Sequence, residues 1–309
     1  MKRKIVKHGG STLTISLPSK WVKANNFKNG QYLNVKSSPQ GLLISSDEIS
    51  LNKLETEIKG DQEWYVYRIL RHLYTHGYDE IIIRHSTKEQ LALIRKGLEK
   101  LQGFEIVESK SKFSRIKCLT SLESAEYENT VKSVMWLILS QFDHFIEDIN
   151  KKKPVMHEEV NEIFKTILKL NNLCRRLINK KPPYDSVTSK YAYRFLTSLL
   201  NISAFIVYSE DYSTKSRAIN LTEKEKDFVI KVRDFYHDLL QAYQNLNVQK
   251  TRSFFDEREA MFDDVLELLK DKNPVITHYF LDILKELSSI GNLILVLQLN
   301  EESKDGKKS

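Results

Sequence analysis

The sequence predicts a multidomain protein with a small β-rich domain, a small α/β module and an all-α domain built as a pair of three-helix bundles. Its 309 residues are enough for two or three domains. Alternation of apolar and polar residues is concentrated near the N-terminus, whereas six long segments with helical periodicity follow Leu122. The content of only 10 Gly and 6 Pro also favours helices over many turns. We therefore expect domains at 1–46, 47–120 and 121–300, and a disordered polar tail at 301–309.

The first domain contains the stretch GGSTLTISLPSKW at residues 9–21. Leu13, Ile15 and Leu17 alternate with polar residues, which is the pattern of a half-buried strand. Pro18 is expected to end this strand and to open a short helix. Further strands are predicted at 2–7, 31–36 and 42–45. So small a ββαββ unit does not bury a good core alone. We expect a homodimer through shared strands, with Leu13, Ile15 and Leu17 in its core.

The net charge of the protein is concentrated in this first domain. Residues 1–46 hold no Asp or Glu, and their eight cations are Lys2, Arg3, Lys4, Lys7, Lys20, Lys23, Lys28 and Lys36. The domain is thus +8 while the whole chain is +7, so that residues 47–309 sum to −1. A domain with so much positive charge is typical of a protein that binds a polyanion, most often nucleic acid. The alternative is a solvated basic tail, but a tail has no need of alternating apolar residues.

The segment 47–120 has the pattern of a small α/β module. Helices are predicted at 61–75 and 87–101, and strands at 80–84, 104–109 and 114–120. One helix separates the first two strands and none separates the last two, so we expect a mixed sheet. His72 and His76 lie four residues apart on a helix, but no third metal ligand is placed with them. We interpret these two residues and His85 as surface histidines.

The six predicted helices of the last domain fall into two trios that resemble each other. They are expected at about 122–150, 155–179, 187–212, 222–247, 249–270 and 274–300. The breaks between them are rich in Asn, Asp, Lys and Pro, and Thr222 with Glu225 has the spacing of a capping box. The third helix of each trio has an aromatic start and a centre of small residues. Alignment of Asn201 with Asn292 gives an offset of 91 residues, which predicts an internal repeat.

Residues 3–45 as a whole resemble a known DNA-binding family. The strand before Gly9-Gly10, the SLPSKW entry to the short helix, the FKNG turn and the closing GLLI strand are similar to the AbrB/SpoVT-like swapped-hairpin domain. This resemblance implies an interleaved dimer that grips DNA with its basic face. The contact candidates it implies are Lys2, Arg3, Lys4, Lys7, His8 and Lys20, and we add Lys23 from the same short helix. The GGST and SLPSKW forms resemble the version fused to PhoU-like regulators in archaea.

The helical domain resembles the PhoU fold, through its paired trios and the IGN of its last helix. That family represses or adapts phosphate uptake, and carboxylates in its third helices help bind metal clusters. Here the corresponding pairs are neutral: Thr197 with Asn201, and Ser288 with Asn292. Metal ions in proteins favour carboxylate, imidazole or thiolate ligands over amides and hydroxyls. We therefore expect no metal at these degenerate positions, and no cofactor.

The sequence favours a regulator over an enzyme. It contains neither a G-x-x-x-x-G-K-[ST] phosphate loop nor a G-x-S-x-G nucleophile elbow. Two cysteines without metal or redox spacing, and no long apolar run, indicate a cytoplasmic protein without membrane insertion. We expect a transcriptional regulator of phosphate uptake or phosphate homeostasis that binds double-stranded DNA as a dimer. The alternative is an adaptor that docks on a phosphate transporter or a signalling kinase without binding DNA.

Overall fold

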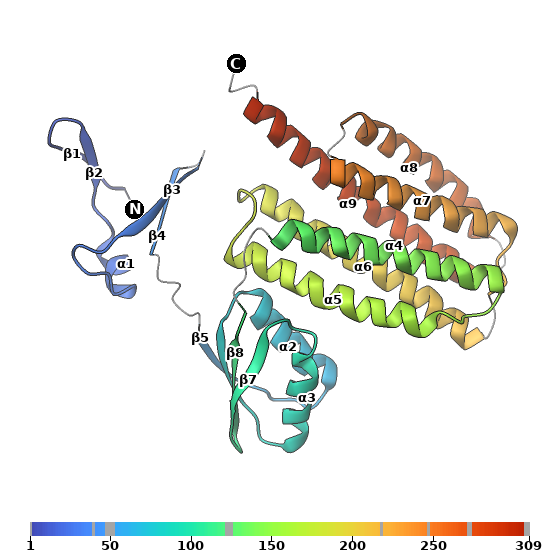
Figure 1. The fold of residues 1–309 in the computed structure, drawn as a ribbon, viewed down its shortest axis with the longest axis horizontal. Coiled ribbons are helices and arrows are strands. Elements are labelled where there is room, and N and C mark those ends of the chain that lie inside the picture. The colour runs from blue at the N-terminus through green and yellow to red at the C-terminus, as the bar shows by residue number, and fades with distance from the viewer. Residues whose placement is uncertain are drawn as a thin grey trace. The chain divides into compact units, whose positions relative to one another are not determined.

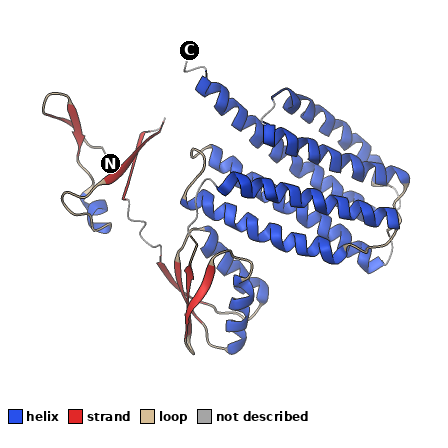
Figure 2. Cartoon of the chain, viewed as in Figure 1, coloured by secondary structure: helices blue, strands red, loops and turns tan. Residues whose placement is uncertain are grey.

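The chain divides into two compact units, Met1–Ser50 and Leu51–Ser309, here called unit 1 and unit 2 (Figure 1). The computed structural model describes residues 2–38, 41–46, 53–120, 126–216, 219–245, 248–270 and 274–305. Strands occur in the N-terminal part of the chain, and the C-terminal part is helical (Figure 2). The predicted mixed, multidomain class is therefore confirmed. None of the described helices is long and apolar enough to cross a membrane.

Unit 1 has the predicted ββαββ order. Its elements are β1 (Ile5–His8), β2 (Thr12–Ile15), α1 (Ser19–Ala24), β3 (Leu33–Ser38) and β4 (Gly41–Ser46). The strands form two separate antiparallel hairpins, β1–β2 and β3–β4. Among the residues of unit 1 whose burial is described, none is buried. The described residues of one copy of unit 1 therefore form no buried core.

The first part of unit 2 is the α/β module. It consists of β5 (Lys53–Glu57), α2 (Glu63–Thr75), β6 (Glu80–Arg84), α3 (Lys88–Leu98), β7 (Phe104–Ser109) and β8 (Phe113–Cys118). The strand order is β5-β6-β8-β7, with β5 parallel to β6 and β8 antiparallel to both of its neighbours. The mixed sheet was predicted, but β5 was missed. The prediction for His85 was also wrong, because this residue is 4% exposed and contacts the Ser114 hydroxyl at 3.0 Å.

The rest of unit 2 is a helical domain with one continuous apolar core. Its helices are α4 (Glu126–Lys151), α5 (His157–Lys180), α6 (Thr188–Ser216), α7 (Glu223–Asn245), α8 (Val248–Leu268) and α9 (Pro274–Asp305). The predicted capping box before α7 is confirmed: the Thr222 amide donates to Glu225 at 2.6 Å and the Glu225 amide donates to the Thr222 hydroxyl at 3.3 Å. Helix α9 includes residues 301–305 of the predicted tail, and residues 306–309 lie outside the described residues.

The helices of each trio pack on one another, and the trios meet through equivalent members. Helices α4, α5 and α6 are mutually in contact, as are α7, α8 and α9. Between the trios, third helix α6 packs on third helix α9 and first helix α4 packs on first helix α7 (Figure 1). This pairing is what an approximate twofold relation between two copies of one unit would produce.

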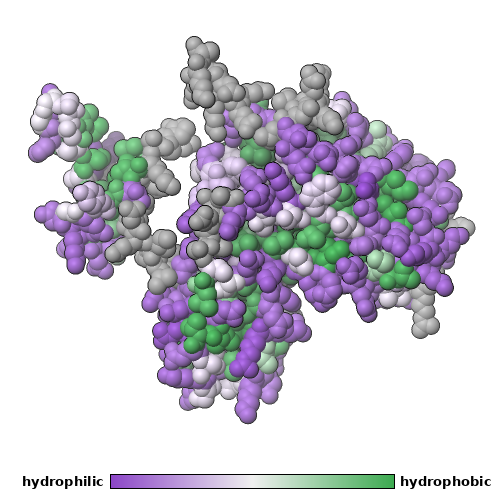
Figure 3. All heavy atoms as spheres, in the orientation of Figure 1, coloured by the Kyte–Doolittle hydropathy of each residue, from purple (hydrophilic) through white to green (hydrophobic). Residues whose placement is uncertain are grey.

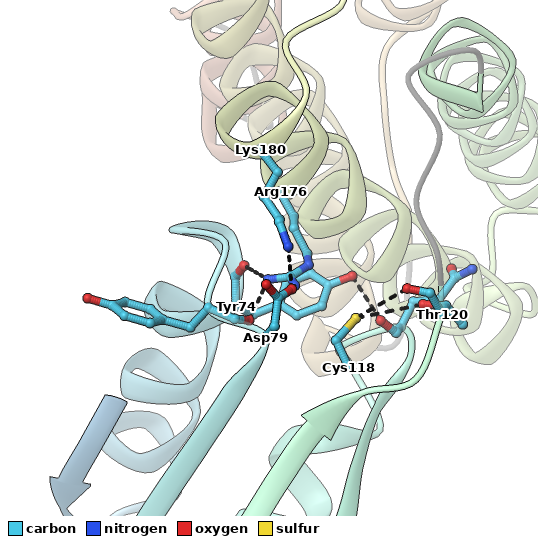
Figure 4. A network of polar contacts seen from close by, with 8 residues as sticks. Tyr74, Asp79, Cys118, Thr120, Arg176 and Lys180 are labelled. Carbon is cyan, nitrogen blue, oxygen red and sulfur yellow. Dashed lines mark hydrogen bonds and ion pairs between the residues drawn. The ribbon is translucent and has the colours of Figure 1, made fainter. Parts of the chain in front are cut away.

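Arg176 fastens the α/β module to the helical domain (Figure 4). Its side chain on α5 is fully buried. The guanidinium donates to the carbonyls of Tyr74 and Tyr78, both at 2.8 Å, and to Asp79 at 2.7 Å. Lys180, one turn further along α5, also pairs with Asp79. Arg176 therefore adds a second donor to the Tyr74 carbonyl at the end of α2, which also accepts from the Gly77 amide at 3.0 Å, and it neutralises a buried carboxylate.

Candidate nucleic-acid interface

The β1–β2 hairpin begins the basic unit. Gly9 turns the chain with φ of +71°, a left-handed conformation that glycine adopts without strain. The register pairs Ile5 with Ile15 and Lys7 with Leu13. Across the hairpin, the Thr14 hydroxyl donates a hydrogen bond to the carbonyl of Val6 at 3.1 Å. This side-chain contact adds to the backbone pairing of the two strands.

This register divides the side chains of the hairpin between two faces. Successive side chains of a strand point to opposite faces, and directly paired residues share a face. One face therefore carries Ile5, Lys7, Leu13 and Ile15, and the other carries Val6, His8, Thr12 and Thr14. The structure thus places Lys7, a predicted DNA contact, opposite Leu13 on the predicted dimer face. Leu17 lies beyond the end of β2, where the chain enters α1.

The remaining predicted DNA contacts lie before β1 and on α1. Lys2, Arg3 and Lys4 precede the strand, and Lys20 and Lys23 lie on the short helix. All seven candidates, including Lys7 and His8, are exposed. No carboxylate in the described part of the chain pairs with any of them. Their positive charges are therefore available to a polyanion.

Helix α1 is held by contacts at its C-terminal end. The Asn25 side-chain amide donates to the carbonyl of Trp21 at 2.8 Å. The rings of Trp21 and Phe27 meet edge to face, with their centroids 4.8 Å apart. These local contacts fix the short helix that carries Lys20 and Lys23, although the helix buries no residue.

Apolar side chains of unit 1 are exposed in the single chain (Figure 3). The exposed fractions are 67% for Ile5, 67% for Leu13 and 51% for Ile15. The second hairpin repeats the feature, with Val35 at 57% and Leu42 at 66%. Isolated two-stranded hairpins are at best marginally stable in water. These apolar faces therefore need another surface to cover them. The alternation of apolar and polar residues in the sequence had already predicted most of these faces.

One degenerate motif position of the helical domain, Asn201, contacts a carboxylate that sequence reasoning missed. Glu286 on α9 accepts hydrogen bonds from Ser198 at 2.6 Å and from Asn201 at 2.8 Å, both on α6. Arg194 forms an ion pair with the same carboxylate at 3.0 Å. At the contact between α6 and α9, the positive charge beside Glu286 therefore comes from the guanidinium of Arg194. Only its partners on α6 could have identified Glu286, and the contact with Arg194 spans 92 residues.

The other three positions of that motif make local contacts or are exposed. The Thr197 hydroxyl accepts a hydrogen bond from Arg175 at 3.1 Å. The Ser288 hydroxyl donates to the carbonyl of Lys285 at 2.9 Å, and Asn292 is exposed. Within the described ranges, no group of three or more His, Cys, Asp or Glu side chains could hold a metal ion.

Two carboxyl groups are buried together where α4 packs on α6. Asp148 and Glu210 are both fully buried. Asp148 accepts from the backbone amide of Met156 at 2.9 Å, whereas neither oxygen of Glu210 receives a hydrogen bond from the described residues. Burial raises the pKa of Glu210 to about 8, and the neighbouring Asp148 contributes in the same direction. Glu210 therefore carries a proton at neutral pH.

Comparison of the chain with protein-family models and with curated proteins finds no match.

Proposed function

We propose that the protein is a transcriptional regulator that binds double-stranded DNA as a homodimer through residues 1–46. The charge distribution carries this proposal: eight cations and no carboxylate lie in residues 1–46, while the remainder of the chain is close to neutral. Phosphate contacts by Lys and Arg supply most of the affinity in non-specific DNA binding. The fork-shaped guanidinium of Arg3 is the group of this set best suited to recognise guanine.

The exposed apolar faces support the homodimer. A second copy of unit 1 presents the same faces, so that strand exchange between two chains would cover Leu13 and Ile15 and would bring two basic sets together. The resemblance of residues 3–45 to swapped-hairpin domains implies the same arrangement. A solvated basic tail does not account for four strands with alternating apolar residues.

We infer that the helical domain is the part that responds to phosphate status or docks a partner. Two trios of helices that meet through equivalent members are consistent with the resemblance to PhoU-like proteins. The α/β module is joined to this domain by buried Arg176. Catalysis is not part of the proposal, because the sequence lacks the motifs of the enzyme classes considered.

A protein adaptor is the second candidate. In it, the helical domain would dock on a phosphate transporter or a signalling kinase, and unit 1 would serve only for dimerisation. The exposed apolar faces fit this role equally well. The concentration of positive charge does not, because an adaptor has no need of cations gathered in one unit.

Charge reversal in unit 1 distinguishes the two candidates. Lys2→Glu/Lys4→Glu should strongly weaken binding to duplex DNA in a fluorescence titration, while light scattering still shows a dimer. The matched control is Lys169→Glu/Lys215→Glu, which changes net charge equally at two exposed lysines of unit 2. Equal DNA binding by both variants would favour the adaptor.

A further inference from the structure

Helix α2 carries a stripe of aromatic and cationic side chains that has no part in the proposed function. Trp64, Arg68, Arg71 and His72 follow the spacing of one helix face. Trp64 is 61% exposed, and the guanidinium of Arg68 lies over its ring at 5.4 Å from the centroid. The opposite face of α2 carries Val66, Leu70 and Tyr74, which are buried in the core of the α/β module. The stripe therefore faces away from that core.

Arg175 on α5 extends the stripe. Its guanidinium lies over the ring of Tyr193 at 4.9 Å and donates to Asn171 at 2.8 Å. Burial lowers the pKa of Arg175, and the nearby charge of Arg71 acts in the same direction. Burial also lowers the pKa of His72, and Arg71 and Arg68 lower it further. The cations of the two helices are thus close enough to repel one another.

Carboxylates do not neutralise this group. Arg68, Arg71 and Arg175 form no ion pair with any residue that the structure describes. The acidic residue of α2 is Glu63, and its carboxylate already forms ion pairs with Lys96 at 2.7 Å and with Lys100 at 3.9 Å. Mutual repulsion among unpaired arginines is a cost that an anionic partner would remove.

The shape of the stripe selects the kind of anion. Small-molecule sites are concave, whereas the outer face of a helix is convex and presents its cations in a row. Exposed Arg68 and half-buried Arg71, beside the exposed indole of Trp64, suit the extended phosphate backbone of a nucleic acid, and half-buried Arg175 adds charge behind them. The proposed function already supplies such a polyanion, double-stranded DNA, so this duplex is the natural candidate.

We propose that Arg68, Arg71 and Arg175 form a second contact surface for the phosphate backbone of double-stranded DNA, outside unit 1. This inference rests on the proposed function and extends it. The surface adds affinity without reading bases, because it presents charge on a convex face rather than a helix or strand inserted in a groove. It would also connect DNA binding to the helical domain, since Arg175 and buried Arg176 are neighbours on α5.

The test compares charge-reversed variants of the full-length chain in titrations with a fluorescent duplex at about 50 and about 200 mM salt. Arg68→Glu/Arg71→Glu should bind at least about tenfold more weakly at low salt, and its log–log salt slope should be shallower by about two. Lys169→Glu/Lys215→Glu is the control of equal charge, and it should keep the wild-type slope. Arg68→Gln/Arg71→Gln should lose less affinity, and it serves if the reversed variant has a lowered melting temperature.

The outcomes separate this inference from the function on which it rests. If Arg68→Glu/Arg71→Glu matches the control while Lys2→Glu/Lys4→Glu strongly weakens binding, the α2 surface is overturned and the regulator stands. If weak salt-sensitive binding survives in Lys2→Glu/Lys4→Glu and disappears when the arginines are also reversed, the α2 surface is supported. If the wild-type chain shows no salt-sensitive binding, both proposals are overturned.

Discussion

At the residue scale, neighbouring positions of β1 face different surroundings. Lys7 lies opposite Leu13 on the apolar face, whereas His8 shares the other face with Thr12 and Thr14. A lysine can lay its aliphatic stem along an apolar surface and keep its ammonium in water. We therefore expect Lys7 to contribute to dimer packing as well as to charge, unlike Lys4.

Single reversals of Lys4 and Lys7 test this division. Lys4→Glu should reduce DNA affinity and make the salt slope shallower by about one, with the dimer unchanged. Lys7→Glu should also weaken the dimer, because it places a carboxylate beside the apolar face. Light scattering over a dilution series measures the dimer. Equal dimer stability in the two variants would contradict the assignment of Lys7 to the apolar face.

Ile15→Asp tests the predicted dimer core directly. Burying a carboxylate without a partner costs about 3–5 kcal/mol, so this variant should be monomeric or aggregated in light scattering. Thr12→Asp is the matched control, because Thr12 lies on the opposite face of the same strand. A normal dimer in the Ile15 variant would remove Ile15 from the interface.

Glu210 makes the stability of unit 2 depend on pH. Its pKa of about 8 in the folded chain lies above the ordinary value of 4.5, so folding takes up a proton between these two pH values. The free energy of unfolding should therefore fall as pH rises from about 4.5 to about 8.

The substitution Glu210→Gln isolates this effect. Near pH 5 the variant should match the wild type, because a protonated carboxyl and an amide are alike in charge and shape. Near pH 8 it should be more stable by about 4 kcal/mol, because each unit by which folding raises the pKa of Glu210 corresponds to about 1.4 kcal/mol. Denaturant unfolding at the two pH values measures both differences, and parallel pH profiles would refute the buried proton.

At the element scale, α2 and α5 depend on one buried ion pair. Arg176→Met should destabilise unit 2 by about 3–5 kcal/mol, because it leaves Asp79 buried with only Lys180 as a cationic partner. Lys165→Met is the control on the same helix, since its pair with Glu162 is exposed and such pairs contribute at most about 1 kcal/mol. Thermal unfolding of both variants gives the comparison. Similar melting temperatures would mean that the junction is held by apolar packing alone.

Periodicity predicted most elements because their burial follows the spacing of their apolar residues. Helices α2 and α3 and the helices from α4 to α9 have this property. The hairpins of unit 1 were predicted from alternation alone, because none of their described residues is buried in the single chain. Strand β5 does not: Lys53–Glu57 reads KLETE, with charges at three of five positions. It pairs only with β6 at the edge of the sheet, where charged residues are tolerated and discourage further pairing.

The contacts of Arg176 and Glu286 could not be predicted from local patterns. Arg176 meets Asp79 across 97 residues, and Glu286 meets Arg194 across 92. Nothing in the spacing of either pair distinguishes these charges from those of a solvated helix face. Only the packing of α5 on α2 and of α6 on α9 brings the partners together. Sequence reasoning found the basic residues of unit 1 because their signal is compositional and local.

At the scale of the whole molecule, charge and packing divide the chain in the same place. Unit 1 carries the positive charge and has no buried residue among those whose burial is described, whereas unit 2 has two apolar cores. A unit without a core is completed by association, and a basic unit is attracted to a polyanion. The account therefore expects unit 1 to gain order from a second copy, and unit 2 to be stable by itself.

The most direct test is a titration of the full-length chain with duplex DNA from its own promoter region, at two salt concentrations, with and without residues 1–46. The account predicts binding that weakens steeply with salt in the full chain. Removal of residues 1–46 should leave at most weak residual binding. A full-length dimer that shows no salt-sensitive affinity for DNA would contradict the account and would favour a protein adaptor.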